Sequence, residues 1–533
     1  MTEVLTAAER RCNNKQEIID DLQRRLNDKI LEPSNFDLLK KLVENAKTLD
    51  EAIKIAELGT TYKRTGFHFD KRLEKESNVI SYFKKNASLS FVTDKNTITH
   101  KLIIGDNYPA LLNLLVEYKS KIDAIYIDPP YSKDNLGKFA ETNYENAITR
   151  DNLLSMLYPR LWLAKKLLSE NGVIFCSIDD KNQAYVKCLF DDVFEEKNFV
   201  ALFPWRKRTA KSDVPFWVSQ DYEWILCYAK SDKFIAKTNG EPRNYYETPD
   251  FPDRPWRKHD LTKQTSAIER PNSFFDMIDP KTGKKYPANP NRTWAITSDT
   301  FDKYYSDGKI IFPGQYDFLK MSQPAFRYFK DEDMKKAGKN FGYKAVSTNL
   351  PIEVGMSQDG TKDIKELFAE IPFLHPKPVA LIKYLLKVAT GEDSIVLDFF
   401  VGTGTTGQAV LQLNREDGGT REFIGVTSNE ITPMNPAGIA VDVTTKRLKR
   451  VMTGKCYDGT SDFEWVKKNK PYGDNLDVLN IEEISNFQAV EGATPFDVID
   501  ETLYGVYKFD TVKEKIEWVC DNFEATQKRI EEI

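Results

Sequence analysis

The sequence predicts an α/β fold with a mostly parallel central sheet, and three observations lead to this prediction. Short apolar runs typical of buried strands occur at residues 101–105, 122–127 and 172–178. An amphipathic helical pattern over residues 151–172 separates two of these runs and ends on Asn-Gly, a common signal for a helix C-terminus. A further strand, a Gly-rich turn and a helix follow at 393–414. Strand–helix–strand alternation of this kind indicates parallel strands joined by helices.

The chain of 533 residues is long enough for several domains, and its composition changes along its length. Helical spacing of apolar residues dominates the first part, whereas Pro, Asn, aromatic and basic residues crowd a loop-rich stretch in the middle. The predicted segments are a helical N-terminal arm at 1–90, a first α/β segment at 91–235, the loop-rich insertion at 236–370, a second α/β segment at 371–455 and a C-terminal region at 456–533.

Bulk composition narrows the class of protein. The apolar fraction of 41% and the charged fraction of 29% are those of a globular protein. The net charge of −5 argues neither for nor against nucleic acid, because a local basic surface suffices for phosphate contacts. The six cysteines show no CxxC spacing, so we expect no metal site, no disulfide framework and a cytoplasmic location. No membrane-spanning apolar run and no signal peptide are evident.

Gly402, Gly404 and Gly407 form a G-x-G-x-x-G pattern between a predicted strand and a predicted helix. Glycines there allow a tight turn and bring a ligand close to the backbone. Glu430 ends the next predicted strand, where acids usually hold ribose hydroxyls. These residues predict a cofactor that contains adenosine, either NAD or S-adenosyl-L-methionine. Asp398 and the aromatic pair after it favour the second, because a carboxylate and aromatic faces suit a sulfonium cation better than a pyrophosphate.

The tetrad Asp128, Pro129, Pro130 and Tyr131 follows another predicted strand. It should therefore lie at the carboxyl edge of the sheet, where ligands bind. The prolines have no N–H, so the backbone offers only acceptors, and the Asp128 carboxylate and the Pro129 carbonyl converge. Two acceptors beside the flat ring of Tyr131 suit a planar exocyclic amine. A nucleobase in a duplex would have to be flipped out to reach them.

With DPPY followed by DFFVGTGTTG, the chain resembles amino-group DNA methyltransferases. The order of the two motifs is similar to that of the β class, which includes N6-adenine enzymes. Further blocks, among them DYEWILCYAKS, HPKPVALIKYLL and PFDVIDETLYG, resemble the Mod (modification) subunits of type III restriction–modification systems. The resemblance extends from about residue 98 to the end of the sequence.

This resemblance implies a class I S-adenosylmethionine-dependent methyltransferase fold, Rossmann-like and mostly parallel, circularly ordered so that DPPY precedes the Gly-rich loop. Segments 91–235 and 371–455 would be the catalytic and cofactor halves of that domain, and 236–370 an inserted target-recognition domain. The implied activity is site-specific transfer of a methyl group from S-adenosyl-L-methionine to N6 of a flipped-out adenine. The implied partners are double-stranded DNA, a second copy of the chain in a homodimer, and a separate Res (helicase-nuclease) subunit.

The resemblance also assigns residues where the motifs match. Asp128, Pro129, Pro130 and Tyr131 would form the catalytic tetrad. Transfer would be direct and in line, so we expect Cys176 to be a core residue and not a nucleophile. The predicted cofactor-binding residues, of which the two in HPKP open a helix covering the cofactor, are Asp106, Lys377, Pro378, Asp398, Phe400, Gly402, Gly404, Thr405 and Glu430.

The insertion is expected to contact DNA through basic side chains interleaved with the aromatic residues Trp256, Tyr286 and Trp294. The predicted DNA-binding residues are Arg254, Arg257, Lys258, Lys263, Arg270 and Arg292.

Three other functions stay open at this point. An N4-cytosine methyltransferase of the same fold would use the same motif, because both amines present the same donors. An NAD-dependent oxidoreductase would explain the G-x-G-x-x-G pattern but not DPPY. A DNA-recognition subunit that depends on a partner for activity is also compatible with the fold, although the intact DPPY tetrad argues against it.

Overall fold

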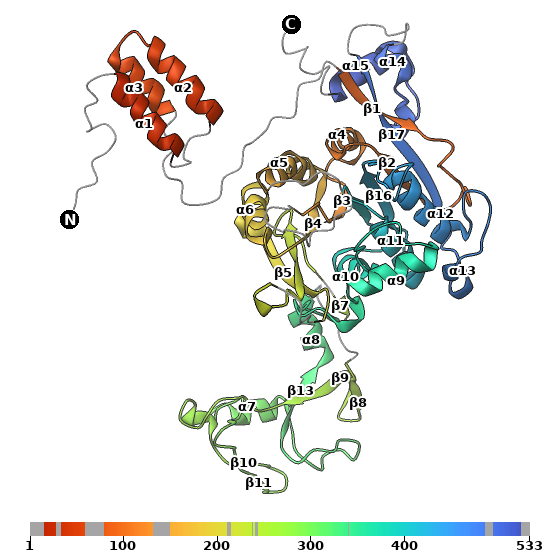
Figure 1. Ribbon diagram of the computed structural model, residues 1–533. Coiled ribbons are helices and arrows are strands. Elements are labelled where there is room, and N and C mark those ends of the chain that lie inside the picture. The colour runs from red at the N-terminus through yellow and green to blue at the C-terminus, as the bar shows by residue number, and fades with distance from the viewer. Residues whose placement is uncertain are drawn as a thin grey trace.

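A computed structural model confirms the predicted α/β architecture, with one nine-stranded sheet between two layers of helices (Figure 1). Parallel pairing joins β17, β2, β16, β15, β3 and β4 in that order, and β1, β6 and β5 pair antiparallel at the two margins. The structure describes residues 15–27, 33–58, 79–131, 150–209, 215–236, 238–239, 243–338, 341–485 and 494–523.

The strands of this sheet come from both predicted α/β segments and from both flanking regions of the chain. In spatial order they are β1 (Val79–Lys85), β17 (Asn475–Ser485), β2 (Thr99–Ile104), β16 (Glu422–Thr427), β15 (Ile395–Asp398), β3 (Ile122–Ile127), β4 (Leu168–Ile178), β6 (Tyr222–Ala229) and β5 (Phe199–Arg206).

Successive residues of each strand point to opposite faces of the sheet, and their side chains pack in two hydrophobic cores, one on each face. On β3, Ile125 and Ile127 belong to one core, whereas Ala124 and Tyr126 belong to the other. The first core takes up α4 (Asn107–Tyr118), α5 (Arg150–Leu167), α6 (Gln183–Phe194), α14 (Pro495–Val498) and α15 (Val512–Asn522). The second takes up α9 (Ser357–Leu367), α10 (Val379–Ala389), α11 (Thr405–Asp417), α12 (Lys446–Thr453) and α13 (Glu464–Lys468).

The N-terminal helices form a unit with a hydrophobic core of its own. They are α1 (Lys15–Asn27), α2 (Pro33–Asn45) and α3 (Leu49–Leu58). Each contributes an apolar stripe, represented by Leu22 and Val43, both fully buried. The predicted arm at 1–90 differs from the structure at its end, because β1 already belongs to the central sheet.

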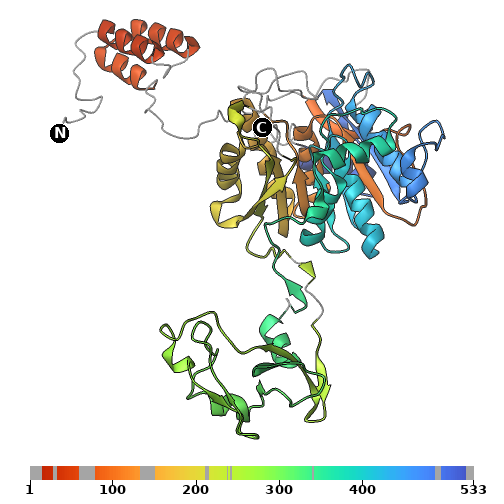
Figure 2. The ribbon, with the colours of Figure 1, turned by 60° about the horizontal axis from the view of Figure 1, so that its bottom comes forward.

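The insertion is built mainly from β structure and is joined to the sheet domain by the short pair β7 and β14 (Figures 1 and 2). A four-stranded sheet in the order β12-β13-β9-β8 forms its centre. The elements are β7 (Thr238–Asn239), β8 (Tyr246–Thr248), β9 (Phe251–Asp260), β10 (Met277–Ile278), β11 (Lys285–Tyr286), α7 (Phe301–Ser306), β12 (Ile310–Ile311), β13 (Ala325–Phe329), α8 (Lys330–Ala337) and β14 (Tyr343–Lys344).

The aromatic residues of the insertion correct one expectation. Trp256, Tyr286 and Trp294 are 0%, 3% and 2% exposed and pack in the two small cores of this domain. Rings that are buried this far stabilise the domain and cannot stack on a nucleobase. The insertion also ends before residue 370, because Val354 and Leu367 already pack in the core of the sheet domain. Among the described residues, no helix has the length and apolar character needed to cross a membrane.

Candidate active site

The DPPY tetrad lies at the carboxyl end of β3, in the middle of the sheet. The neighbours of β3 are β15, which leads into the Gly-rich turn, and β4. Pro129 is buried and Pro130 and Tyr131 are half-buried, so the tetrad forms part of the wall of the sheet edge. The Tyr131 hydroxyl donates a hydrogen bond to Asp128 Oδ1 over 2.9 Å. This bond fixes the ring beside the carboxylate.

Lys377 is the main partner of the Asp128 carboxylate. Its Nζ lies 2.8 Å from both Asp128 oxygens and 3.0 Å from the Tyr131 hydroxyl. Glu223 on β6 completes the cluster, with Oε2 at 3.3 Å from the same ammonium and 3.4 Å from the Tyr131 hydroxyl. Lys207 pairs with the other Glu223 oxygen over 3.1 Å. Sequence reasoning assigned Lys377 to the cofactor and missed Glu223, whereas in the structure Lys377 contacts the Asp128 carboxylate and Glu223 contacts Lys377.

The segment before α10 delivers Lys377 to this position. This segment packs directly against Gly360 of α9, where no larger residue would fit, because a Cβ there would lie 2.0 Å from the Pro376 carbonyl oxygen. His375 has a φ of 54°, and Pro378 forms the N-cap of α10. Fixed backbone geometry at the two prolines therefore aims the lysine side chain at Asp128.

Burial and charge oppose each other in this cluster. Burial disfavours the ionised form of Glu223, but attraction to Lys377 and Lys207 outweighs it and lowers the pKa of Glu223. For Lys377, burial works against the ammonium, yet Asp128 and Glu223 outweigh it and raise its pKa. Burial, reinforced by Asp128, raises the pKa of Tyr131 well above its usual value. At neutral pH the site therefore holds an ammonium, a charged Glu223 and a neutral phenol.

The Gly-rich turn connects β15 to α11 on the strand next to DPPY. Gly402 and Gly404 have φ of 48° and 81°, in the left-handed region that glycine adopts without strain. A Cβ on Gly402 would have its nearest neighbours at 3.8 Å, an ordinary contact distance, so the turn has room for a methyl group there. A Cβ on Gly407 would instead lie 2.8 Å from Leu448 and 2.9 Å from Phe423. The first two glycines thus shape the turn, whereas the third permits close packing of α11.

The buried side chain of Asp398 stabilises the Gly-rich turn by hydrogen bonds. Its carboxylate is 2% exposed and accepts hydrogen bonds from the Phe400 N–H over 2.9 Å and the Thr406 hydroxyl over 2.6 Å. Sequence reasoning expected this carboxylate to face a cationic ligand, but its oxygens accept from the turn itself. Burial raises the pKa of Asp398 to about 7. Phe400, by contrast, is half-buried beside the turn.

This raised pKa leads to a prediction about stability. The folded chain holds a proton on Asp398 at a pH where the unfolded chain has lost it, so its contribution to stability should fall as pH rises from about 4 to 7. We expect Asp398→Asn to remove this component. Thermal unfolding midpoints measured from pH 4 to pH 8 for both proteins would test it, and parallel pH profiles would contradict it.

Arg447 is a residue that sequence reasoning missed. It is fully buried behind the turn, where Nη1 donates to the hydroxyls of Thr403 and Thr405 over 2.9 Å each and Nε donates to Gln408 over 2.8 Å. Burial lowers the pKa of Arg447 to about 10, which leaves it charged at neutral pH. Thr405, a predicted cofactor residue, therefore also has a structural role. In the sequence KRLKR, nothing distinguishes Arg447 from a surface charge.

Asp106 and Glu430 lie at the ends of the two strands beyond β15. Asp106 is the N-cap of α4, accepts from the Tyr108 N–H over 2.7 Å and pairs with Arg160 over 2.9 Å. Its side chain is 61% exposed. The adjacent Asn107 donates to the Phe399 carbonyl over 2.8 Å, which ties this end of α4 to the Gly-rich turn. Glu430 is half-buried, three residues past the end of β16.

The six predicted DNA-binding residues lie in the insertion, apart from the DPPY cluster. Several of them pair with acids of the same domain: Arg254 with Asp331 and Glu332, Arg257 with Asp333, and Arg292 with Asp260. Lys258 and Lys263 are exposed, and Arg270 is half-exposed.

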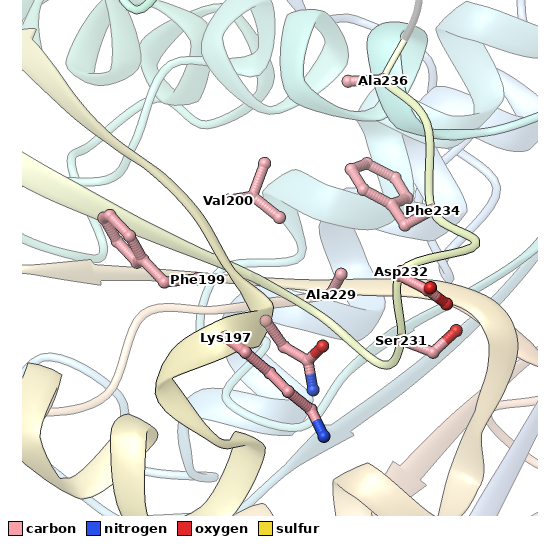
Figure 3. Close-up of a pocket in the computed structure, with 9 residues that line it drawn as sticks. Lys197, Phe199, Val200, Ala229, Ser231, Asp232, Phe234 and Ala236 are labelled. Atoms are coloured by element: carbon pink, nitrogen blue, oxygen red, sulfur yellow. The ribbon is translucent and has the colours of Figure 1, made fainter.

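A shallow hollow of about 170 Å³ lies at the opposite edge of the sheet (Figure 3). Lys197, Phe199, Ser231 and Phe234 are among its lining residues, at the start of β5 and beyond the end of β6. The hollow does not involve the DPPY or Gly-rich segments. No cluster of His, Cys, Asp and Glu suited to a metal ion is found in the part of the chain that the structure describes. Cys176 is fully buried in the core.

The mostly parallel sheet, the Gly-rich turn and the adjacent acidic tetrad define an α/β protein of the class I methyltransferase type. A family model described as DNA methylase, for N6 and N4 methyltransferases, matches residues 122–432, and the chain belongs to this family. A second family model, of an uncharacterised conserved protein, matches residues 14–124. Membership in the first family disfavours the NAD-dependent oxidoreductase alternative.

Named relatives include enzymes of two restriction–modification types. The chain is 30% identical to the type III enzyme StyLTI Mod subunit of Salmonella typhimurium, with 69% of this chain and 61% of that protein covered. It is 26% identical to the type II methyltransferase M.KpnI of Klebsiella pneumoniae, with 74% and 97% covered. The solved M1.HpyAVI–SAM complex is 16% identical, with 65% of this chain and 98% of that chain covered and a TM-score of 0.30. The chain spans about three fifths of the length of the StyLTI relative.

Proposed function

We propose that this chain is a site-specific DNA methyltransferase that transfers a methyl group from S-adenosyl-L-methionine to N6 of an adenine flipped out of the duplex. One observation carries the proposal: Asp128 and the Gly-rich turn end neighbouring parallel strands, so a receptor for an amine adjoins a turn of the type that binds cofactors. Parallel strands place their carboxyl ends at one edge, where ligands bind in open α/β sheets.

The residues around the turn suit S-adenosyl-L-methionine. The backbone of Gly402, the half-buried ring of Phe400 and the exposed carboxylate of Asp106 lie along the same sheet edge. Phe400, Gly402 and Gly404 would hold the methionine end, and Asp106 and Glu430 the adenosine end. When bound, the cofactor would supply an electrophilic methyl group on a sulfonium centre.

The tetrad would orient the target amine. Asp128 and the Pro129 carbonyl would accept its two N–H groups, and Tyr131 would stack on the base, so that the nitrogen lone pair points at the methyl group. In the free protein Lys377 touches both Asp128 oxygens. Glu223 lies 3.3 Å from the same ammonium, so Lys377 keeps a counter-charge when an amine takes one of those oxygens.

We extend the proposal to the modification and recognition subunit of a type III restriction–modification system, which acts in the cytoplasm. The 30% sequence identity to the StyLTI Mod subunit supports this extension. In such a system the insertion would contact DNA, a second copy of the chain would complete a homodimer, and a separate Res subunit would cleave. The N4-cytosine reaction is the alternative, because the family model covers both amines.

The test is to express the chain alone in a host without DNA methylation and to sequence the host DNA by a single-molecule method that detects modified bases. An Asp128→Ala strain serves as the control. Methylated adenines at one short site, absent from the control, would support the proposal. Methylated cytosines would favour the alternative, and unmodified DNA would contradict the activity of the isolated chain.

A pair of glycine variants should separate cofactor binding from stability. Gly402→Ala forces an alanine into the left-handed region at a cost of about 1–2 kcal/mol, so we expect about tenfold weaker S-adenosyl-L-methionine binding and a small fall in the unfolding midpoint. Gly407→Ala places its methyl 2.8 Å from Leu448, so we expect a lower unfolding midpoint. Calorimetric titration and thermal unfolding measure the two effects. Unchanged affinity in Gly402→Ala would count against the assignment of the turn.

A further inference from the structure

The hairpin of β5 and β6 carries an exposed apolar tip. Phe216, Trp217 and Val218 are 96%, 83% and 69% exposed. Phe216 and Trp217 also have φ of 57° and 55°, a region that bulky side chains avoid. Apolar groups that stay exposed add no stability, and backbone strain opposes folding. Their combination at one tip favours a role in binding over a role in stability.

The tip arises directly from the catalytic cluster. In the hairpin, Trp205 pairs with Glu223. Glu223 Oε2 lies 3.4 Å from the Tyr131 hydroxyl and 3.3 Å from Lys377 Nζ. Trp217 precedes Glu223 by a few residues on the same hairpin. The exposed rings therefore lie at the sheet edge that holds the DPPY tetrad.

Basic residues mark the base of the same hairpin. Arg206 is exposed and Arg208 is partly exposed, whereas the Lys207 ammonium pairs with Glu223. Hydrogen bonds from the Lys207 N–H to the Asp221 carbonyl and from Arg208 Nε to the Gln220 carbonyl, at 2.9 Å and 3.0 Å, hold the two arms together. Cations beneath two projecting aromatic rings suit a partner that offers phosphates outside and stacked bases inside, which is duplex DNA.

We propose that Phe216 and Trp217 form a wedge that enters the duplex beside the target base and occupies the space that the flipped base leaves. The inference rests on the proposed function, because a wedge is needed only where a base must leave the stack. Aromatic side chains stack on bases of any sequence, so the wedge would open the duplex without adding sequence specificity.

The test compares two duplexes that carry the methylated site found by sequencing. In one the target adenine is paired, and in the other it faces an abasic position, where flipping costs less. We expect the double variant F216A/W217A to lose about tenfold or more of its single-turnover methylation rate on the paired duplex. On the abasic duplex its rate should approach that of the wild type. Similar losses on both duplexes, or no loss on the paired one, would overturn the wedge.

Tyr507→Ala is the matched control, because Tyr507 is 94% exposed and belongs to the C-terminal region that packs against β1 at the other margin of the sheet. Its rates should equal those of the wild type on both duplexes. The glycine variants F216G and W217G would also relieve backbone strain, so their unfolding midpoints should not fall below that of the wild type. If the wild-type chain methylates neither duplex, the proposed function fails and the wedge fails with it.

Discussion

Replacement of Asp128 by alanine is expected to lower the methylation rate by at least about 100-fold, the usual cost of removing one oriented group from a transfer site. The physical reason is that Asp128 is one of the two acceptors that would orient the target amine. Affinity for S-adenosyl-L-methionine should stay within about twofold, because the Gly-rich turn does not depend on this carboxylate. Single-turnover methylation and calorimetric titration measure the two quantities.

Asp128→Asn is the matched control for this loss. Asparagine keeps the size of the side chain and one acceptor oxygen, but it removes the charge that holds Lys377 at 2.8 Å. We expect an intermediate rate, because the remaining oxygen still accepts one N–H. Tyr131→Ala should also lower the rate with little effect on cofactor affinity. Retained methylation in both Asp128→Ala and Tyr131→Ala would contradict the assignment of the tetrad.

The sequence predicted the parts of the fold that depend on local pattern. Buried strands at 122–127 and 172–178 and the turn at Gly402 and Gly404 are all found as expected, because apolar runs and glycine spacing are properties of short segments. The predicted cofactor and catalytic motifs adjoin in space because β15 and β3 are neighbours in the sheet.

The sequence could not predict contacts between distant segments. Glu223 lies about 150 residues before Lys377, and only the sheet order brings the two side chains within 3.3 Å. The orientation of Asp398 into its own turn and the burial of Trp256 are likewise set by tertiary packing. A basic or aromatic residue within a loop-rich stretch has the same pattern whether it faces DNA or a core. For this reason the sequence pattern predicts DNA contacts for Trp256, Tyr286 and Trp294, although these rings are buried.

Replacement of Lys377 by methionine should have the largest effect on stability. It removes the cation that lies between Asp128 and Glu223, and it leaves two carboxylates facing one phenol. Removal of one member of a buried ion pair usually costs about 3–5 kcal/mol, and we expect a loss of this size in the free energy of unfolding. Methylation should fall as well, because Asp128 loses the partner that positions it.

The pH dependence of this variant tests the electrostatic explanation. In the wild type Lys377 helps to lower the pKa of Glu223. Without it, Lys207 alone opposes the effect of burial, so the pKa of Glu223 should rise above its unfolded value and the variant should gain stability as pH falls from about 8 to 5. The double variant K377M/E223Q removes this buried charge and should recover much of the lost stability at pH 8. If the double variant is no more stable than K377M, lost packing around Lys377 would explain the effect, and the buried charges would not.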